Sequence, residues 1–249
     1  MTSRVYGKQI NLDSESVRNF WNSKSSKEGL QSVLLGKSGN DEPQKYRNFI
    51  ETNLLVSLLE KNHFLSKNLS VLDVGCGIGR WYSNLKEYIS SYVGIDSSSN
   101  FINELSKRYK DEETLQFVNC ELENFDFSQF KKKFDLIIIT GVLMYINDDF
   151  VQKILCNILN CLASSGAIYL QESVSLLNER LTLDNFFSDE LDSEYSAIYR
   201  TVSEYETYFN SALCSLNVKE KGLLLNEKSG ARTETNAMYW LITKKNMEL

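Results

Sequence analysis

The chain has 249 residues, 42% hydrophobic and 12% aromatic, which is long enough to bury one substantial core with a smaller cap. Its net charge of −6 is unlike the basic footprint of nucleic-acid-binding proteins, so we expect neither RNA nor DNA as a substrate. No apolar run approaches the roughly 18 residues of a membrane span, and no secretory signal is recognisable. We expect a soluble, cytoplasmic protein that would serve a membrane-associated assembly only by docking to it.

The first 45 residues are mostly polar and contain the cluster Phe20-Trp21-Asn22, and we interpret residues 1–45 as an N-terminal cap. The triplet Asp41-Glu42-Pro43 marks the start of a helix. Apolar residues then recur with helical spacing through Tyr46–Glu60. This helix opens the part that we expect to form the core, residues 46–172.

An apolar strand beginning at Val71 ends on alternating glycines, in the sequence VLDVGCGIGRW. Glycine lacks a Cβ and tolerates positive φ, so the backbone at Gly75, Gly77 and Gly79 can turn sharply and let a ligand lie against it. The spacing is G-x-G-x-G, whereas the dinucleotide fingerprint is G-x-G-x-x-G. Taken alone, the loop is also compatible with a purely structural turn.

Further apolar runs of strand length follow the glycine loop. The run at 91–96 ends on Asp96, about twenty residues after the first strand, where a carboxylate can accept both hydroxyls of a ribose. Similar runs at 115–121, 134–140 and 167–172 are separated by helical stretches. This alternation predicts βαβ units and a parallel sheet.

Residues 173–203 leave this alternation, and we interpret them as an insertion on the substrate side of one domain that spans residues 1–249. The remaining residues, 204–249, predict a helix and a closing strand pair. We expect the helix over Ser203–Leu213, with Ser203 and Glu206 forming a capping box. The strands are expected at 218–225 and 237–243.

Five cysteines, an odd number without a secretory signal, predict reduced and mostly buried thiols rather than disulfides or metal ligands. The single histidine, His63, is interpreted as a helix-end or surface residue. Asn147-Asp148-Asp149 could supply oxygen ligands to Mg²⁺. The same residues stand where a helix would begin, and we favour the helix cap. We therefore predict no metal site.

The segment from about Leu72 to Glu172 resembles the class I S-adenosylmethionine-dependent methyltransferases. The loop Asp73–Gly79 is similar to the first motif of that family, and Asp96 to its ribose-binding acid. Cys120-Glu121-Leu122 falls where the family contacts adenine. The resemblance implies an α/β fold with a Rossmann-like, doubly wound, seven-stranded, mostly parallel sheet whose last strand is antiparallel. It also implies a helical N-terminal cap and an insertion after the fifth strand.

The resemblance further implies S-adenosylmethionine as cofactor and S-adenosylhomocysteine as product. Arg47 is our candidate for the cofactor carboxylate, because Arg47 and Glu51 reproduce an Arg-x-x-x-Glu helix of the family. The same spacing also forms an ordinary helical ion pair, and Arg80 is expected to be solvated or packed on Trp81. The full set of expected cofactor contacts is Arg47, Asp73, Gly75, Cys76, Gly77, Asp96, Ser97, Glu121, Leu122, Thr140 and Leu143.

The acceptor side is less defined by the sequence. Thr140-Gly141-Val142-Leu143 lacks the two prolines found here in methyltransferases of planar nitrogens, and the only proline is Pro43. With no histidine nearby, Glu172 is our candidate for a general base, because burial can raise a carboxyl pKa toward neutrality. Arg200 would hold a carboxylate or phosphate of the acceptor, or form a surface ion pair. The other polar groups expected near the methyl group are Tyr145, Tyr195 and Tyr199.

The resemblance implies O-methylation of a polar small molecule or glycan, such as a sugar hydroxyl in surface polysaccharide assembly. One alternative is N-methylation of an amine, either an aminosugar or a protein N-terminus. Another is a cofactor-binding partner subunit without activity of its own. The sequence predicts no oligomeric state.

Overall fold

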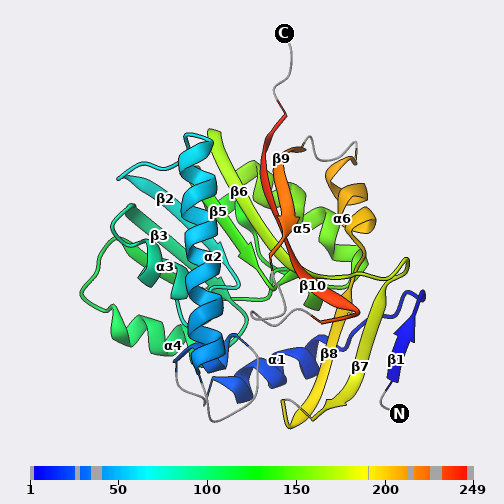
Figure 1. Cartoon of the computed structure of the whole chain (residues 1–249). Helices are drawn as coiled ribbons and strands as arrows, with labels where there is room; N and C mark the ends of the chain where they lie inside the picture. The colour runs from blue at the N-terminus through cyan, green and yellow to red at the C-terminus, as the bar shows by residue number, and fades with distance from the viewer. Residues whose placement is uncertain are drawn as a thin grey trace.

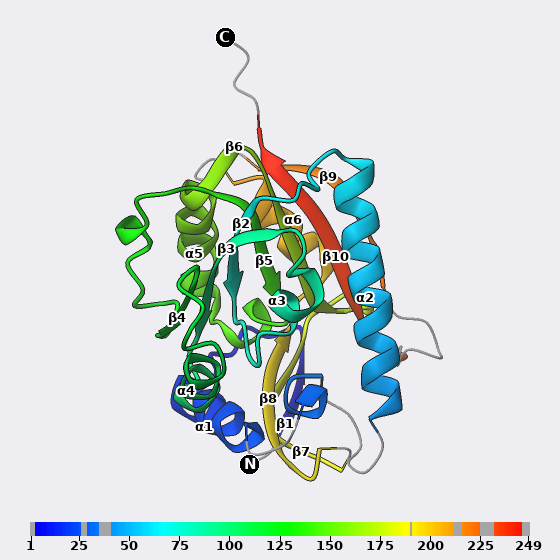
Figure 2. The same ribbon diagram turned by 90° about the vertical axis from the view of Figure 1, so that its left-hand side faces the viewer.

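A computed structural model describes residues 3–25, 29–34, 41–189, 191–211, 216–224 and 232–245. Its main sheet has seven strands in the order β4-β3-β2-β5-β6-β10-β9 (Figures 1 and 2). Strands β2 to β6 pair in parallel, and β10 runs antiparallel to both of its neighbours. The doubly wound sheet with an antiparallel last strand is therefore confirmed. Its strands are β2 (Leu69–Val74), β3 (Ile89–Asp96), β4 (Leu115–Asn119), β5 (Phe134–Thr140), β6 (Leu162–Ser175), β9 (Leu216–Leu223) and β10 (Thr235–Lys244).

Helices cover both faces of this sheet, and Figure 2 shows the sheet between α2 and α5. On one face, α2 (Glu42–Lys61) and α3 (Arg80–Leu85) bury leucines and Trp81 against β2, β3 and β5. On the other face, α5 (Asp148–Cys161) and α6 (Val202–Phe209) pack on the isoleucines of β5 and on Trp240. Helix α4 (Ser99–Arg108) packs on Cys76 of the glycine loop. Burial on both faces explains why the central strands read as continuous apolar runs.

The insertion forms a β-hairpin of β7 (Leu181–Ser188) and β8 (Ser193–Tyr199). The N-terminal strand β1 (Ser3–Tyr6) pairs with β7 and completes a separate three-stranded antiparallel sheet. Helix α1 (Ser14–Lys24) contacts β8, and Figures 1 and 2 show both at the same end of the main sheet. The cap is thus not only helical, since its first strand belongs to the insertion sheet.

Three helix starts test the sequence signals directly. Helix α5 begins at Asp148 after Asn147, and α2 begins at Glu42 with Pro43 in its first turn, both as predicted. The predicted start of α6 is wrong by two residues, because Thr201 and Glu204 form the capping box in place of Ser203 and Glu206. Both pairs satisfy the same T/S-x-x-E pattern, and the pairing of Ser175 with Thr201 keeps Thr201 extended.

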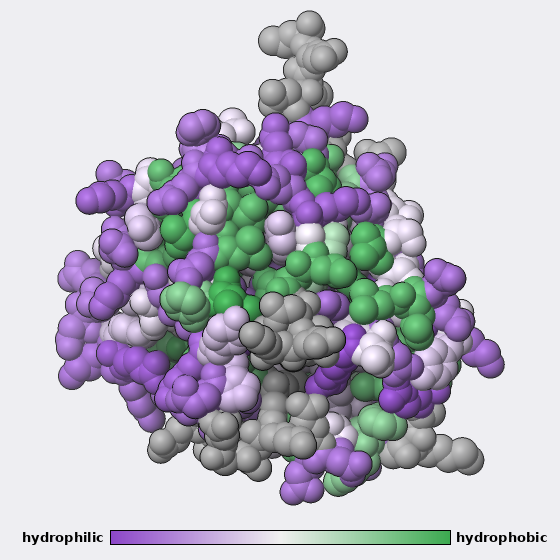
Figure 3. All heavy atoms as spheres, in the orientation of Figure 1, coloured by the Kyte–Doolittle hydropathy of each residue, from purple (hydrophilic) through white to green (hydrophobic). Residues whose placement is uncertain are grey.

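Smaller elements complete the chain: η1 (Gly29–Ser32), η2 (Phe127–Gln129) and η3 (Leu143–Tyr145). The predicted helix end at Leu213 and strand end at Leu225 lie outside the described residues. Figure 3 shows hydrophilic residues around the margin of the face seen in Figure 1 and hydrophobic residues toward its middle. Within the described ranges, no helix combines the length and the apolar character needed to cross a bilayer.

Candidate active site

The glycine loop after β2 lines a cavity of about 980 Å³. Gly75 and Gly77 have φ of +75° and +52°, a conformation that strains other residues. A Cβ at Gly75 would lie 2.3 Å from Cγ2 of Val142, and one at Gly77 would lie 2.6 Å from Cγ1 of Val33. The loop can therefore pack this closely only with glycine, and its backbone forms part of the cavity wall.

Asp96 ends β3 beside this loop and, with Ser97, lines the cavity. Its Oδ2 accepts a hydrogen bond from the Gly77 N–H at 2.9 Å, and its Oδ1 accepts one from the Ser98 N–H at 2.8 Å. Burial raises the pKa of Asp96, while these two backbone donors oppose the shift. Each carboxylate oxygen keeps a further lone pair. The pair can therefore accept two hydroxyl groups, which fits the ribose of an adenosyl cofactor.

Glu121 and Leu122 follow β4 and line the cavity farther along. Glu121 is ion-paired with Arg18 of α1 and accepts a hydrogen bond from the Asn124 amide at 3.2 Å. The sequence did not indicate Arg18, which lies about a hundred residues earlier in the chain and reaches Glu121 only through the placement of α1. The predicted adenine contact, Glu121, is thus joined to the N-terminal cap by an ion pair.

A cluster of charges lies where the cofactor carboxylate was expected. The buried Glu51 carboxylate contacts Arg47 Nε at 2.7 Å, Arg80 Nη2 at 2.6 Å and Gln171 Nε2 at 2.9 Å. Burial opposes ionisation, but the guanidinium groups of Arg80 and Arg47 hold the pKa of Glu51 below its usual value. Two cations around one carboxylate leave a net positive charge, and Arg47 lines the cavity with a quarter of its side chain exposed. Arg47 therefore forms the helical ion pair and remains placed to hold an anion.

The other predicted cofactor contacts divide into two groups. Cys76 and Thr140 line the cavity, and Thr140 Oγ1 accepts a hydrogen bond from Trp81 Nε1 at 3.0 Å. Asp73 and Leu143 are fully buried and do not line it. Asp73 Oδ2 instead accepts a hydrogen bond from the Tyr92 hydroxyl at 2.5 Å, and burial raises the pKa of Asp73 to about 7. Asp73 therefore supports the loop from behind.

Aromatic residues from three parts of the chain also line the cavity. The hydroxyls of Tyr145 in η3 and Tyr195 in β8 are 2.8 Å apart, and Tyr199 lines the cavity beside them. Trp21 of α1 meets the Tyr145 ring edge to face, with centroids 5.4 Å apart. Burial raises the pKa of both Tyr145 and Tyr195, so their hydroxyls remain protonated near neutral pH. They can accept and donate hydrogen bonds there but cannot serve as bases.

Glu172 lines the cavity, but its carboxylate is already engaged. Oε1 accepts the backbone N–H groups of Val142 and Leu143 at 2.9 and 2.8 Å, and Oε2 accepts that of Met144 at 3.3 Å. Burial raises the pKa of Glu172 to about 7, against the opposite effect of these donors. The predicted general base thus holds the loop that follows β5.

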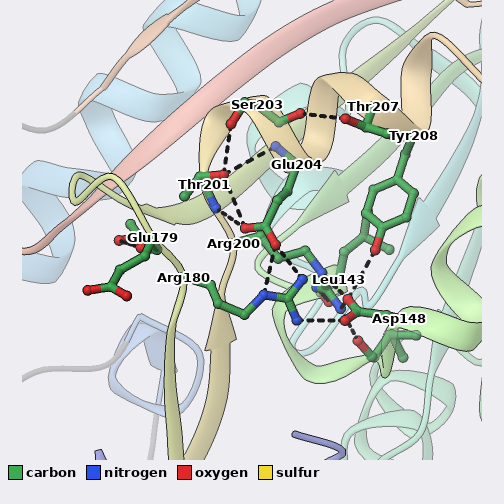
Figure 4. Close-up of polar contacts among 12 residues, drawn as sticks. Leu143, Asp148, Glu179, Arg180, Arg200, Thr201, Ser203, Glu204, Thr207 and Tyr208 are labelled. Carbon is green, nitrogen blue, oxygen red and sulfur yellow. Dashed lines mark hydrogen bonds and ion pairs between the residues drawn. The ribbon is translucent and has the colours of Figure 1, made fainter. Parts of the chain in front are cut away.

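Arg200 contradicts its predicted role as an acceptor anchor. Its side chain is completely buried, does not line the cavity, and is not a surface ion pair either. Nη1 donates to the Leu143 carbonyl and Nη2 to the Ile146 carbonyl, both at 2.7 Å (Figure 4). Nε donates to Asp148 Oδ1 at 2.7 Å. The sequence could not reveal this, because β8 turns Arg200 into the core next to α5.

Three further groups bear on the predicted chemistry. Cys76, Cys120 and Cys161 are free thiols, but Cys156 is disulfide-bonded, so the prediction of reduced cysteines is wrong there. Cys156 is half-buried in α5 and packs against the core. His63 follows the last turn of α2 with φ of +62°. The described part of the chain contains no cluster of three or more metal-ligating side chains.

The doubly wound sheet and the cavity at its glycine loop suit a nucleotide-type cofactor, and comparison with known proteins points the same way. The family model described as "Methyltransferase domain" matches residues 72–168. Over residues 72–168 the chain thus matches a methyltransferase domain, and solved S-adenosylmethionine-dependent methyltransferases share its fold, some of them with S-adenosylhomocysteine bound, which supports S-adenosylmethionine as the cofactor.

Relatives in this family act on different atoms. Phosphoethanolamine N-methyltransferase 1 of Caenorhabditis elegans is 25% identical over 67% of this chain and 33% of its own length. An rRNA adenine N-6-methyltransferase of Bacteroides fragilis is 24% identical over 68% of this chain and 62% of its own. A ubiquinone biosynthesis O-methyltransferase of Pelagibacter ubique is 33% identical over 35% of this chain and 36% of its own. The matched region spans less than two thirds of each relative.

A solved structure supports the fold over nearly the whole chain. Haemonchus contortus phosphoethanolamine N-methyltransferase 1, in complex with phosphoethanolamine and S-adenosylhomocysteine, has a TM-score of 0.69 at 19% identity. The match covers 94% of this chain and 50% of that chain. At this identity the similarity establishes the fold and leaves the acceptor to be argued from the cavity.

Proposed function

We propose that the protein transfers the methyl group of S-adenosylmethionine to the nitrogen of a small amine. The observation that carries this proposal is the pair of protonated hydroxyls, Tyr145 and Tyr195, set among aromatic rings in the same cavity as the glycine loop. The cofactor supplies an activated methyl group, so the protein must mainly align a nucleophile with it.

The tyrosine hydroxyls and aromatic rings of the cavity suit an amine acceptor better than a hydroxyl acceptor. A neutral amine carries its own nucleophilic lone pair, whereas a hydroxyl acceptor needs a base to remove its proton. The carboxylate of Glu172, which lines the same cavity, is held by three backbone N–H groups. Aromatic faces attract the ammonium form of the acceptor by about 0.5–2 kcal/mol. Once the ammonium has released a proton to water, the tyrosine hydroxyls can accept N–H bonds of the neutral amine, whose lone pair attacks the methyl group.

The charged groups on the cofactor side fit their expected roles. Asp96 would accept the ribose hydroxyls, Glu121 would face the adenine amino group, and Arg47 would pair with the carboxylate. Gly75, Cys76, Gly77, Ser97, Leu122 and Thr140 would complete the cofactor wall.

O-methylation of a polar small molecule or glycan is the second candidate, as in a sugar hydroxyl of a surface polysaccharide. Seryl hydroxyls of Ser173 and Ser188 in the cavity wall favour it, because they can hydrogen-bond a polyol. In either case we place the reaction in the cytoplasm, with docking to a membrane-associated assembly if the product is used there. The acceptor would be a small molecule or glycan rather than a nucleic acid, in line with the acidic net charge.

Matched acceptors test the choice between nitrogen and oxygen. The protein is incubated with isotopically methyl-labelled S-adenosylmethionine and one acceptor at a time. The acceptors form two pairs, glucosamine with glucose and ethanolamine phosphate with glycol phosphate. We expect labelled product only from the amino member of a pair. Tyr145→Phe and Tyr195→Phe should lower kcat for that amine by about tenfold, the loss of one hydrogen bond of roughly 1.4 kcal/mol. Transfer to the hydroxyl member alone would overturn the amine proposal.

A further inference from the structure

The loop after β5 carries Tyr145 into the cavity but has little structure of its own. It consists of Gly141 with φ of +66°, Val142, the single 3₁₀ turn η3 and Ile146. One isolated turn of this kind is not stable by itself, because it fixes several dihedral angles for very few hydrogen bonds. The position of the Tyr145 hydroxyl must therefore be fixed by groups outside the loop.

The amide side of the loop is held from β6. Glu172 accepts the backbone N–H groups of Val142, Leu143 and Met144, and the Gln171 carbonyl accepts that of Gly141 at 2.8 Å. Glu172 lies in the interior of β6, three residues before the strand ends. Its carboxylate is thus anchored on a strand that is paired on both sides, with β5 and with β10.

The carbonyl side of the loop is held by Arg200. The two Nη atoms donate to the Leu143 and Ile146 carbonyls, so the guanidinium brackets Tyr145 on both sides. The backbone of Arg200 is fixed as well, because its carbonyl accepts the Ser175 N–H of β6 at 2.9 Å. Glu172 and Arg200 therefore both attach the loop to β6.

Asp148 fixes the orientation of the guanidinium. Its Oδ1 accepts Arg200 Nε and, at 3.0 Å, the Tyr208 hydroxyl, while its Oδ2 accepts Arg180 Nη1 at 2.6 Å. Arg180 also donates to Glu204 and, among the described residues, contacts no carbonyl of the loop (Figure 4). Arg180 therefore shares the buried charge cluster with Arg200 without touching the loop.

We propose that Arg200 is a positioning residue that, together with Glu172, holds the loop 141–146 so that Tyr145 points its hydroxyl at the acceptor. A lysine at position 200 would keep the charge beside Asp148 but could not reach two carbonyls in a fork. The consequence for turnover rests on the proposed function, whereas the consequence for the loop does not.

The experiment measures the effect on the loop separately from the effect on turnover. Hydrogen exchange of the peptide covering residues 141–147 is measured for the wild type, Arg200→Lys and Arg180→Lys with S-adenosylhomocysteine bound. We expect Arg200→Lys to raise exchange in this peptide by about tenfold or more through local opening, and Arg180→Lys to leave it within about twofold. Melting temperatures should fall to a similar extent in both variants, because each exchanges a guanidinium partner of Asp148 for an ammonium group. This comparison requires no acceptor.

Kinetics add the second readout. With an acceptor from the paired panel, Arg200→Lys should lower kcat about tenfold or more with the affinity for S-adenosylhomocysteine unchanged, because misplaced catalytic groups cost rate rather than cofactor binding. If Arg200→Lys fails to fold, Glu172→Gln serves the same purpose, since an amide cannot accept all three backbone N–H groups. Equal exchange of residues 141–147 in the Arg200 and Arg180 variants would overturn the proposal, even if amine transfer were established. Absence of amine transfer with selectively raised exchange would overturn only the proposed acceptor.

Discussion

The cofactor side of the cavity takes Gly75, Gly77 and Asp96 from one continuous βαβ unit, whereas the acceptor side combines Trp21, Tyr145 and Tyr195 from three distant segments. On the cofactor side, the shape of the cavity wall depends mainly on the backbone conformation of the glycines, and Asp96 is fixed by backbone N–H groups. On the acceptor side, side chains touch other side chains across the cavity. The cofactor side therefore tolerates few substitutions. On the acceptor side, substitution of individual side chains can change which acceptor binds. Substitutions on the two sides should therefore have separable effects.

The largest effect is expected at Gly75. Gly75→Ala places a Cβ 2.3 Å from Val142 at positive φ, so strain of about 1–3 kcal/mol is joined by an overpacking cost of similar size. We expect loss of S-adenosylhomocysteine binding in calorimetry and a lower urea midpoint. Gly141→Ala is the control, because Gly141 has φ of +66° with nothing within 4 Å of a new Cβ. Equal losses in both variants would show that strain alone explains the result.

Asp96→Ala should weaken S-adenosylhomocysteine binding about a hundredfold, since two hydrogen bonds to a charged acceptor contribute roughly 1.5–3 kcal/mol each. The shift in melting temperature caused by the ligand should nearly disappear. Asp149→Ala, at an exposed position of α5, is the matched control. Stabilisation of the wild type by NAD equal to that by S-adenosylhomocysteine would contradict the assignment of the cofactor site.

Trp21 tests the acceptor side alone. Trp21→Leu should raise the KM of an amine acceptor about tenfold by removing an aromatic face worth roughly 1 kcal/mol or more to a cation. Trp21→Phe keeps such a face and should raise KM less. Affinity for S-adenosylhomocysteine should stay within about twofold in both variants. A KM that depends only on side-chain volume, and not on aromaticity, would argue against a cationic acceptor.

The smallest change in binding is expected at Asp73. Asp73→Asn should alter S-adenosylhomocysteine affinity by less than about threefold, because Asp73 lies behind the loop and its loss is a packing effect. Its main effect should be on the pH dependence of unfolding. The pKa of Asp73 is about 7 in the folded chain and about 3.9 in an unfolded one, so its stabilising contribution is complete below pH 4 and is lost as pH rises to 7.

Asp73→Asn should therefore reduce the decline of unfolding free energy between pH 5 and 7, measured by urea titration. The pKa of Glu172 is also about 7 in the folded chain, so its stabilising contribution falls over the same pH range and part of the slope should remain. A slope identical to that of the wild type would mean that Asp73 is already ionised in the native protein.

The sequence predicted the sheet, and most of the residues that it proposed for the cofactor line one cavity, because these signals are local. The glycine loop, Asp96 and the continuous apolar strands can each be recognised within one βαβ unit. Arg47 and Glu51 were also recognisable, since they are four residues apart on one helix. These features depend on backbone geometry that neighbouring residues determine.

The acceptor wall could not be predicted to the same degree. Glu172 and Arg200 are charged residues that the sequence placed at the cavity, but their partners are backbone groups of a loop about 30 and 57 positions away. Arg18 likewise reaches Glu121 across 103 positions. Pairings of this kind follow from how the cap and insertion pack on the sheet, and no periodicity in the chain encodes them.

The pairing of β1 with β7 has a consequence for how the chain reaches its native state. Arg4 lies opposite Leu183 in the small sheet and is ion-paired with Glu234, and the Tyr6 hydroxyl also donates to Glu234 at 3.0 Å. These contacts join residues about 180 and 230 positions apart, so they close the longest loops in the molecule and carry the largest entropic cost of closure. Until they form, the outer edge of β7 offers unpaired backbone groups to any other strand. By covering β7, the four-residue strand β1 replaces a longer open edge of the small sheet with a shorter one, and the time before β1 docks is the interval in which the edge of β7 is open to self-association.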